Sequence, residues 1–262
     1  MSLTIDEIPS TDATPLEWWA RTLVSGNRVR GWLPDVFEQY ARILHPAYLR
    51  TETPQGIGHE LATWSDVARW SGKVLTTQAC IDDLLVRGDG ALWSERGSRP
   101  REGQLDPLYL RRLVELLAPT LGVTRDVWFL VWSGYGDGKV YTRQYKRVAE
   151  TSEQREHDDM ELNPSWRGSG RRYLLFSGSI GAPRESAESN LLAEPLRSVP
   201  RPPNFWWPTD REWFVSTDID FFSTYVGGSA SLIGTVLEDD VLETMPVDLD
   251  DPADPCPSSS TI

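Results

Sequence analysis

The first half of the chain carries apolar residues at the three- and four-residue spacing of amphipathic helices. In the clearest case Leu110, Leu113 and Leu117 fall on one side of a segment that begins at Asp106-Pro107. Aspartate as N-cap with proline at the first helical position is a common helix start. The same pattern predicts helices over residues 14–26, 34–44, 63–72, 77–88 and 107–118, with loops at 50–58 and 88–104, and Thr63 and Asp66 as a capping box for the third helix.

After Gly122 the pattern changes from helical to extended. Residues 127–131 are apolar on both faces, which is typical of a buried central strand. Ser229 is the expected N-cap of a final helix over residues 230–237. Further strands are predicted at 139–145, 173–176, 213–217 and 221–226, the last two paired antiparallel around a tight turn at 218–220.

These elements predict an α+β fold: a helical N-terminal portion packed on a mainly antiparallel sheet with a C-terminal helix. Residues 1–13 are polar and are expected to be a mobile lead-in, residues 14–122 the helical portion, and residues 123–246 the sheet and final helix. Residues 247–262, rich in Pro, Asp and Ser, are expected to form a disordered acidic tail. The pattern fits one continuous core and two separate cores equally.

Composition indicates a folded, acidic protein. With 262 residues, 12 Trp, 8 Tyr and 7 Phe, the chain can bury a sizeable core. Its net charge is −13, and residues 148–262, with 21 acids against 8 bases, carry the whole excess. Such a chain repels phosphate backbones and anionic lipid, so nucleic acid and membranes are disfavoured as partners. Without an N-terminal signal pattern or a run of 18 apolar residues, the expected location is the cytoplasm.

The two cysteines do not predict a disulfide. Cys80 falls on the apolar side of a predicted helix, and Cys256 falls in the expected tail. A cysteine on an apolar helix face is typically a small core residue. The sequence therefore predicts a fold without disulfide bonds.

Several short patterns resemble known sites but lack what the chemistry of those sites needs. The glycine-rich run that ends at Lys139 has the wrong spacing for a phosphate loop and precedes a strand, so a hairpin turn is expected. A segment at 68–88 that resembles a helix-turn-helix has no basic face for phosphates. His45, His59 and His157 are not at metal-ligand spacing, so neither a metal nor a cofactor is expected.

The densest group of aromatic, acidic and turn residues lies between residues 203 and 237. Aromatic faces stack on sugars or hold amines, while acids accept hydrogen bonds or transfer protons. Asp218 and Asp220 would point the same way from a continuous strand, as a proton-transfer pair needs. The residues favour a structural interpretation, in which tryptophans fill the core and aspartates form Asx-turns. The candidate ligand- or partner-binding residues are Trp206, Trp207, Asp210, Arg211, Trp213, Asp218 and Asp220, and no catalytic residue is assigned.

Five segments resemble a family of uncharacterised actinobacterial proteins. The segments are Tyr40-Ala41-Arg42-Ile43-Leu44-His45-Pro46-Ala47, Tyr173-Leu174-Leu175-Phe176, Trp207-Pro208-x-Asp210-Arg211-x-Trp213, Asp218-Ile219-Asp220 and Val226-Gly227-Gly228-Ser229. The similarity covers about residues 29–246 and departs from the pattern of the family at Ser133 and Asp218. Because the family has no assigned activity, the resemblance implies no catalytic residue or cofactor.

These observations together predict a non-enzymatic, cytoplasmic interaction module whose acidic, tryptophan-rich surface binds a basic partner protein. An acidic surface gives fast, salt-sensitive capture of basic partners. The alternative is a small-ligand protein or hydrolase, for a sugar or an amine, that uses Trp206, Asp210, Asp218 and Asp220. The sequence predicts no oligomeric state.

Overall fold

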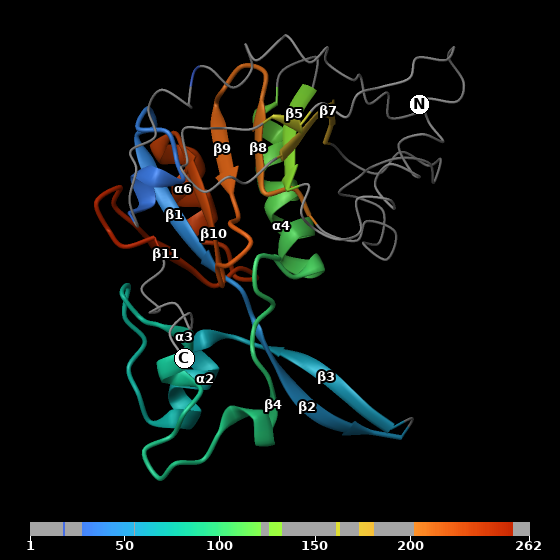
Figure 1. The fold of residues 1–262 in the computed structure, drawn as a ribbon, viewed down its shortest axis with the longest axis vertical. Coiled ribbons are helices and arrows are strands. Elements are labelled where there is room, and N and C mark those ends of the chain that lie inside the picture. The colour runs from blue at the N-terminus through green and yellow to red at the C-terminus, as the bar shows by residue number, and fades with distance from the viewer. Residues whose placement is uncertain are drawn as a thin grey trace.

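The computed structural model has the α+β fold that the sequence predicts (Figure 1). It describes Trp18 and residues 28–54, 56–121, 126–132, 161–162, 173–180 and 202–253; the predicted lead-in at 1–13 and strand at 139–145 lie outside these residues. The elements are η1 (Val29–Gly31), β1 (Gln39–Leu44), β2 (Ala47–Thr53), β3 (Gly56–Ala62), α2 (Trp64–Ser71), α3 (Ile81–Leu84), η2 (Trp93–Glu95), β4 (Gly97–Ser98), α4 (Pro107–Leu117), η3 (Ala118–Thr120), β5 (Asp126–Trp132), β6 (Glu161–Leu162), β7 (Tyr173–Ser179), β8 (Phe205–Pro208), β9 (Trp213–Ser216), β10 (Ser223–Gly228), α6 (Ala230–Leu237) and β11 (Thr244–Pro246).

Within the described residues, eight strands form one antiparallel sheet in the order β11-β1-β10-β9-β8-β5-β7-β6. Its centre is the meander β8-β9-β10, in which Val215 lies between Trp206 and Val226. On one side β5 continues the sheet with Phe129 opposite Trp206, and on the other β1 pairs with β10. The strands that carry the candidate tryptophans are therefore central strands.

Helices α4 and α6 cover one face of this sheet (Figure 1). Asp106 caps α4 by accepting a hydrogen bond from the Leu108 N–H at 2.9 Å, and Pro107 is the first helical residue. Ser229 caps α6 by accepting from the Leu232 N–H at 3.3 Å. The core between helices and sheet contains Leu110, Leu113, Leu117, Trp206, Trp213, Val215, Val226, Ile233 and Val236.

The opposite face of the sheet is rich in aromatic side chains and is covered in part by irregular segments. Tyr40 of β1 and Leu130 of β5 lie on this face. Trp18, the described residue nearest the N-terminus, packs edge-on against Phe37 and Phe214. The buried aromatic residues of this face are Tyr40, Phe205, Trp207, Phe214, Phe221 and Tyr225.

Residues 247–253, predicted to begin a disordered tail, belong to the fold. The N–H groups of Val29 and Arg30 donate to the carbonyls of Asp251 and Leu249, each at 3.0 Å. Val247 and Leu249 pack against the aromatic face, and Ala253 is buried there. These apolar residues alternate with the aspartates, so the segment contributes to the core despite its charge. Residues 254–262 lie outside the described residues.

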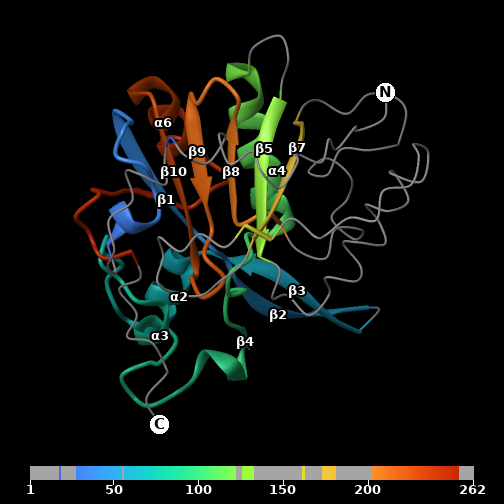
Figure 2. The same cartoon turned by 45° about the horizontal axis from the view of Figure 1, so that its top comes forward.

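A small unit, residues 47–98, lies at the end of the large sheet where β1 finishes (Figures 1 and 2). It contains the three-stranded sheet β3-β2-β4 with α2 and α3, and the hairpin β2-β3 extends away from the body in both views. Leu44 of β1 and Phe222, just before β10, belong to the same core as the small unit. The two parts of the molecule therefore share buried apolar surface. That core contains Leu44, Ala47, Ala62, Trp64, Val67, Ala68, Cys80, Ile81, Leu84, Trp93 and Phe222.

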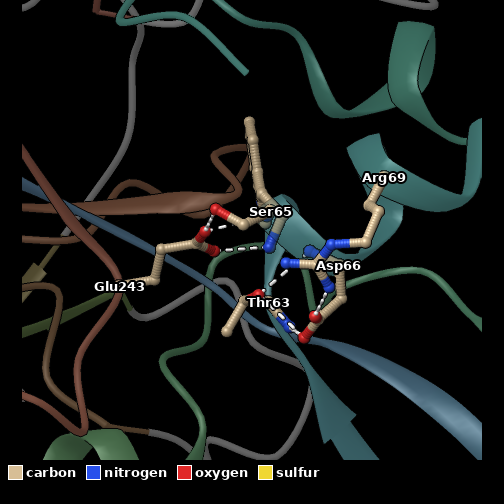
Figure 3. A network of polar contacts seen from close by, with 6 residues as sticks. Thr63, Ser65, Asp66, Arg69 and Glu243 are labelled. Atoms are coloured by element: carbon tan, nitrogen blue, oxygen red, sulfur yellow. Dashed lines mark hydrogen bonds and ion pairs between the residues drawn. The ribbon is translucent and has the colours of Figure 1, made fainter. Parts of the chain in front are cut away.

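A second connection between the two parts lies at the N-terminus of α2 (Figure 3). Thr63 and Asp66 form the predicted capping box, with the Asp66 N–H donating to Thr63 Oγ1 at 3.1 Å. The carboxylate of Glu243, from the segment that leads into β11, accepts from the Ser65 N–H at 2.8 Å and from the Trp64 N–H. A carboxylate that receives two free amides at a helix N-terminus is a favourable charge-assisted arrangement.

The prediction of a helix over residues 34–44 is wrong, because residues 39–44 form strand β1. This strand is buried on both faces: Ala41 and Ile43 pack under the helices, and Tyr40 packs on the aromatic face. Its apolar residues do not alternate, and short apolar runs fit a helix and a buried strand equally. The predicted loop at 50–58 is largely the hairpin β2-β3, and the predicted helix at 77–88 is only the four residues of α3.

The prediction of reduced cysteines also fails at Cys80. This residue is buried as the N-cap of α3, in the small unit, and its sulfur is disulfide-bonded. The sequence contains one further cysteine, Cys256, which lies outside the described residues. Sequence spacing carried no sign of the bond, because the two cysteines are 176 positions apart.

Candidate functional site

The three candidate tryptophans are core residues, with exposed fractions of 0 or 1%. Trp206 and Trp213 meet edge-to-face under the helices at a ring-centroid distance of 5.1 Å. The Trp213 indole N–H donates to Thr120 Oγ1 at 2.9 Å, which joins the sheet to the segment after α4. Trp207 points to the opposite face and stacks on Phe214 at 5.4 Å. The tryptophans therefore do not form a surface.

Asp210 and Arg211 occupy the exposed turn between β8 and β9. The Asp210 carboxylate accepts a hydrogen bond from the Glu212 N–H at 3.3 Å, as in an Asx-turn. Arg211 is at φ 64°, the one left-handed non-glycine residue of the described chain, and its guanidinium lies 5.3 Å from the ring centre of Trp18. The turn thus holds a cation on the aromatic face.

Asp218 and Asp220 occupy the turn between β9 and β10. Asp218 is buried, and its carboxylate accepts the Asp220 N–H at 3.1 Å, whereas Asp220 is exposed. The Asp218 carbonyl accepts the Phe221 N–H at 3.2 Å. The two aspartates therefore form the Asx-turn of the structural interpretation, and they do not point the same way from a strand.

The structure does not bring the candidate residues together. Successive turns of an antiparallel meander lie at opposite ends of the strands. Asp210 is consequently at one end of β9 and Asp218 at the other, with the buried tryptophans between them on two different faces. A role for these side chains in binding a ligand or partner remains a prediction.

A row of buried polar side chains lies at the end of the sheet next to the small unit, and of its members only Asp218 is among the candidate residues predicted from the sequence. At this end β1 finishes at Leu44, β9 finishes at Ser216 and β10 begins at Ser223. We call it the crossing end. Eight polar residues of this region are at most 3% exposed: Arg42, His45, Asn204, Ser216, Thr217, Asp218, Ser223 and Thr224. Polar pairs such as Ser216-Thr217 and Ser223-Thr224 within apolar strands were the available signal.

Hydrogen bonds connect this row across several elements. Arg42 Nε donates to Ser223 Oγ at 2.8 Å, and its guanidinium lies 5.3 Å from the ring centre of Trp64. His45 Nε2 lies 2.9 Å from Thr224 Oγ1, which lies 2.8 Å from Thr217 Oγ1. His45 Nδ1 lies 2.9 Å from the carbonyl oxygen of Arg101.

The Arg101 carbonyl, at one end of this series of hydrogen bonds, determines which group donates in each of them. A carbonyl oxygen can only accept, so His45 Nδ1 carries the proton and donates to Arg101. In the neutral ring Nε2 then accepts from the Thr224 hydroxyl, and Thr224 in turn accepts from Thr217. Burial, with a smaller contribution from the charge of Arg42, lowers the pKa of His45 to about 4.

Acidic residues precede and follow β11, the strand at one border of the large sheet. Residues 238–251 contain seven acids and no base. Arg112 Nε binds Asp239 at 2.7 Å. We call the exposed acids of this stretch, Glu238, Asp240, Asp248 and Asp250, the acidic edge.

Comparisons with known proteins add no assignment to this geometry. In the described part of the chain no group of three or more His, Cys, Asp and Glu side chains is placed to hold a metal ion. No helix among those residues is long and apolar enough to cross a membrane. Searches against protein-family models, curated proteins and solved structures find no match to the chain.

Proposed function

We propose that the protein is a non-enzymatic interaction module that binds a basic partner protein through the acidic edge. The observation that carries the proposal is the charge of residues 238–251, which contain seven acids and no base; Arg112 and Arg30, from elsewhere in the chain, pair with Asp239 and Asp250. Glu238, Asp240 and Asp248 are exposed and make no ion pair with another described residue. Carboxylates without a counter-charge raise the local negative potential, which steers basic partners and speeds their association.

The same acids have a structural role that needs no partner. β11 is an outermost strand, and charged residues beside such a strand prevent pairing with other chains. An experiment must therefore establish that a partner protein binds these acids.

The test is quantitative capture from the native lysate with two variants of equal charge. The first variant, Glu238→Gln, Asp240→Asn and Asp248→Asn, neutralises the acidic edge. The second, Glu52→Gln, Glu60→Gln and Asp83→Asn, neutralises three exposed acids of the small unit. We expect a basic protein that the second variant retains and that the first loses by about tenfold, with weaker capture in 300 mM than in 50 mM salt. A partner retained equally by both variants, or the absence of any partner, contradicts the proposal.

The location of the protein is part of the same proposal. The sequence predicts the cytoplasm, where disulfides are rare. The disulfide-bonded Cys80 instead favours an oxidising compartment. Fractionation of cells with a thiol-labelling assay on the native protein distinguishes the two: a cytoplasmic protein with free thiols supports the first location.

A further inference from the structure

In the described residues, the chain passes between the large sheet and the small unit at two places. The first is His45-Pro46, between β1 and β2, and the second is the segment 99–106 that leads from β4 back to α4. In Figure 1 both passages lie at the crossing end. Any movement of the small unit against the sheet must bend the chain at these two points.

His45 joins both passages through four hydrogen bonds. Its backbone N–H donates to the Phe222 carbonyl at 2.9 Å, and its carbonyl accepts from Trp64 Nε1 of α2 at 2.8 Å. Its ring binds the Arg101 carbonyl of the returning segment and the Thr224 hydroxyl of β10, each at 2.9 Å. One residue thus connects β10, α2 and both passages.

We propose that His45 is an acid-sensitive latch: the neutral ring holds the small unit and the segment 99–106 against the sheet, and protonation of the ring releases them. A protonated imidazole donates from both nitrogens. The Nε2 proton would then point at the hydroxyl proton of Thr224. The hydrogen bonds from Thr217 to Thr224 and from Thr224 to His45 would both have to reverse their direction. The released state, in which water reaches the ring, accepts the proton at no such cost.

Within the described part of the chain, the charge that acts on the pKa of the His45 ring is that of Arg42, and no carboxylate is among the causes of its shift. Arg42, which is nearly fully buried, already places a positive charge near the ring. Asp106 is occupied by the Tyr48 hydroxyl and by the N-terminus of α4. The charged or titratable groups on the elements around His45 are Tyr40 and Arg42 on β1, Tyr48, Arg50 and Glu52 on β2, Asp66 and Arg69 on α2, Arg99, Arg101, Glu102 and Asp106 in the returning segment, Asp218 and Asp220 in the β9-β10 turn, Tyr225 on β10, and Glu243 before β11.

The test is hydrogen exchange of the full-length chain, measured by mass spectrometry at pH 7.5 and pH 5 and corrected for intrinsic exchange rates. The reporter is the segment 99–106, where the Gly103 N–H donates to the Phe221 carbonyl at 2.7 Å. The pKa of the ring is about 6.5 in the released state and about 4 in the closed state. The equilibrium constant for release of the segment therefore rises about 30-fold from pH 7.5 to pH 5. Strands β8 and β9 serve as the internal reference.

Two histidine variants separate the latch from a general effect of acid. His45→Gln removes the titrating group and keeps an amide donor, so opening of 99–106 should become independent of pH. His59→Gln removes an exposed histidine of the hairpin and should retain the full rise. A rise that persists in His45→Gln, or that is equal in β8 and β9, overturns the proposal.

A measurement on the wild type covers the case in which His45→Gln does not fold. The ring nitrogens of His45 are followed by NMR from pH 7.5 to pH 4. The latch requires a neutral ring with its proton on Nδ1 while the segment is closed, and protonation in step with the rise in exchange. A ring that gains its proton near pH 6.5 with no change in exchange overturns the proposal.

Discussion

At the scale of single residues, a close backbone contact lies at Gly103. Its φ of 64° is in the left-handed region, and a Cβ there would overlap the Ile219 carbonyl oxygen. Backbone on both sides leaves no side chain that could give way. This close approach seats the returning segment on the β9-β10 turn.

Gly103→Ala should therefore destabilise the protein by about 2 kcal/mol or more, because it combines an unfavourable φ with an overlap. Gly88→Ala is the matched control: nothing lies within 4 Å of its added Cβ. Urea unfolding of both variants measures the difference. Equal midpoints would mean that the returning segment can shift at little cost.

The candidate site also shows, residue by residue, what sequence can predict. Asx-turns at Asp210 and Asp218 were foreseeable, since aspartate commonly bonds the backbone two residues on. The buried Arg42 was not, because its partners Ser223 and Trp64 are distant in the sequence. Sequence patterns report local preference, whereas the polar row depends on which strands become neighbours.

At the scale of elements, three capping signals predicted helix starts correctly. The predicted cap at Thr76 or Thr77 was wrong, since α3 begins at Ile81 after Cys80. Asp106, Ser229 and the Thr63-Asp66 box each mark a real helix start. Such caps act within one turn, so the local sequence contains the whole interaction. The false helix at 34–44 rested on apolar spacing with Pro34 as its start and His45-Pro46 as its end, without a side-chain cap. Pairing with β10 and β11 made residues 39–44 a strand.

The N-terminus of α2 is completed by a residue that no local signal predicts. Glu243→Ala removes the acceptor of the Ser65 and Trp64 amides and should cost about 1–2 kcal/mol of stability. Glu238→Ala, which removes an exposed acid nearby in sequence, should be almost neutral. Thermal unfolding of the two variants measures the contribution, and a cost for Glu238→Ala as large as that for Glu243→Ala would contradict it.

At the scale of the whole molecule, the C-terminal segment closes the aromatic face. Truncation after Pro246 should cost about 2–4 kcal/mol, because it removes Val247, Leu249 and Ala253 from apolar contact. Truncation after Ala253 is the control, since it also removes Cys256 but keeps residues 247–253. Urea midpoints that match between the two truncations would show that residues 247–253 add nothing to stability.

The global stability should fall in acid through His45. Its pKa is about 4 when folded and 6.5 when unfolded, so the unfolded chain binds the proton first as the pH falls. The contribution is full above pH 6.5 and is lost towards pH 4, a loss of about 3 kcal/mol. Urea unfolding of the wild type and His45→Gln across this range measures it; parallel pH profiles would exclude His45 as the cause.

The position of the small unit has an evolutionary consequence. Its first and last strands are neighbours, with Tyr48 of β2 opposite Ser98 of β4, so the chain leaves the large sheet and re-enters it at nearly one point. A segment with adjacent ends can be gained or lost as a block, because a short turn can replace it. The large sheet with α4 and α6 therefore has the topology of a domain that carries residues 47–98 as an insertion, and an internal deletion joining Pro46 to Pro100 would remove that insertion.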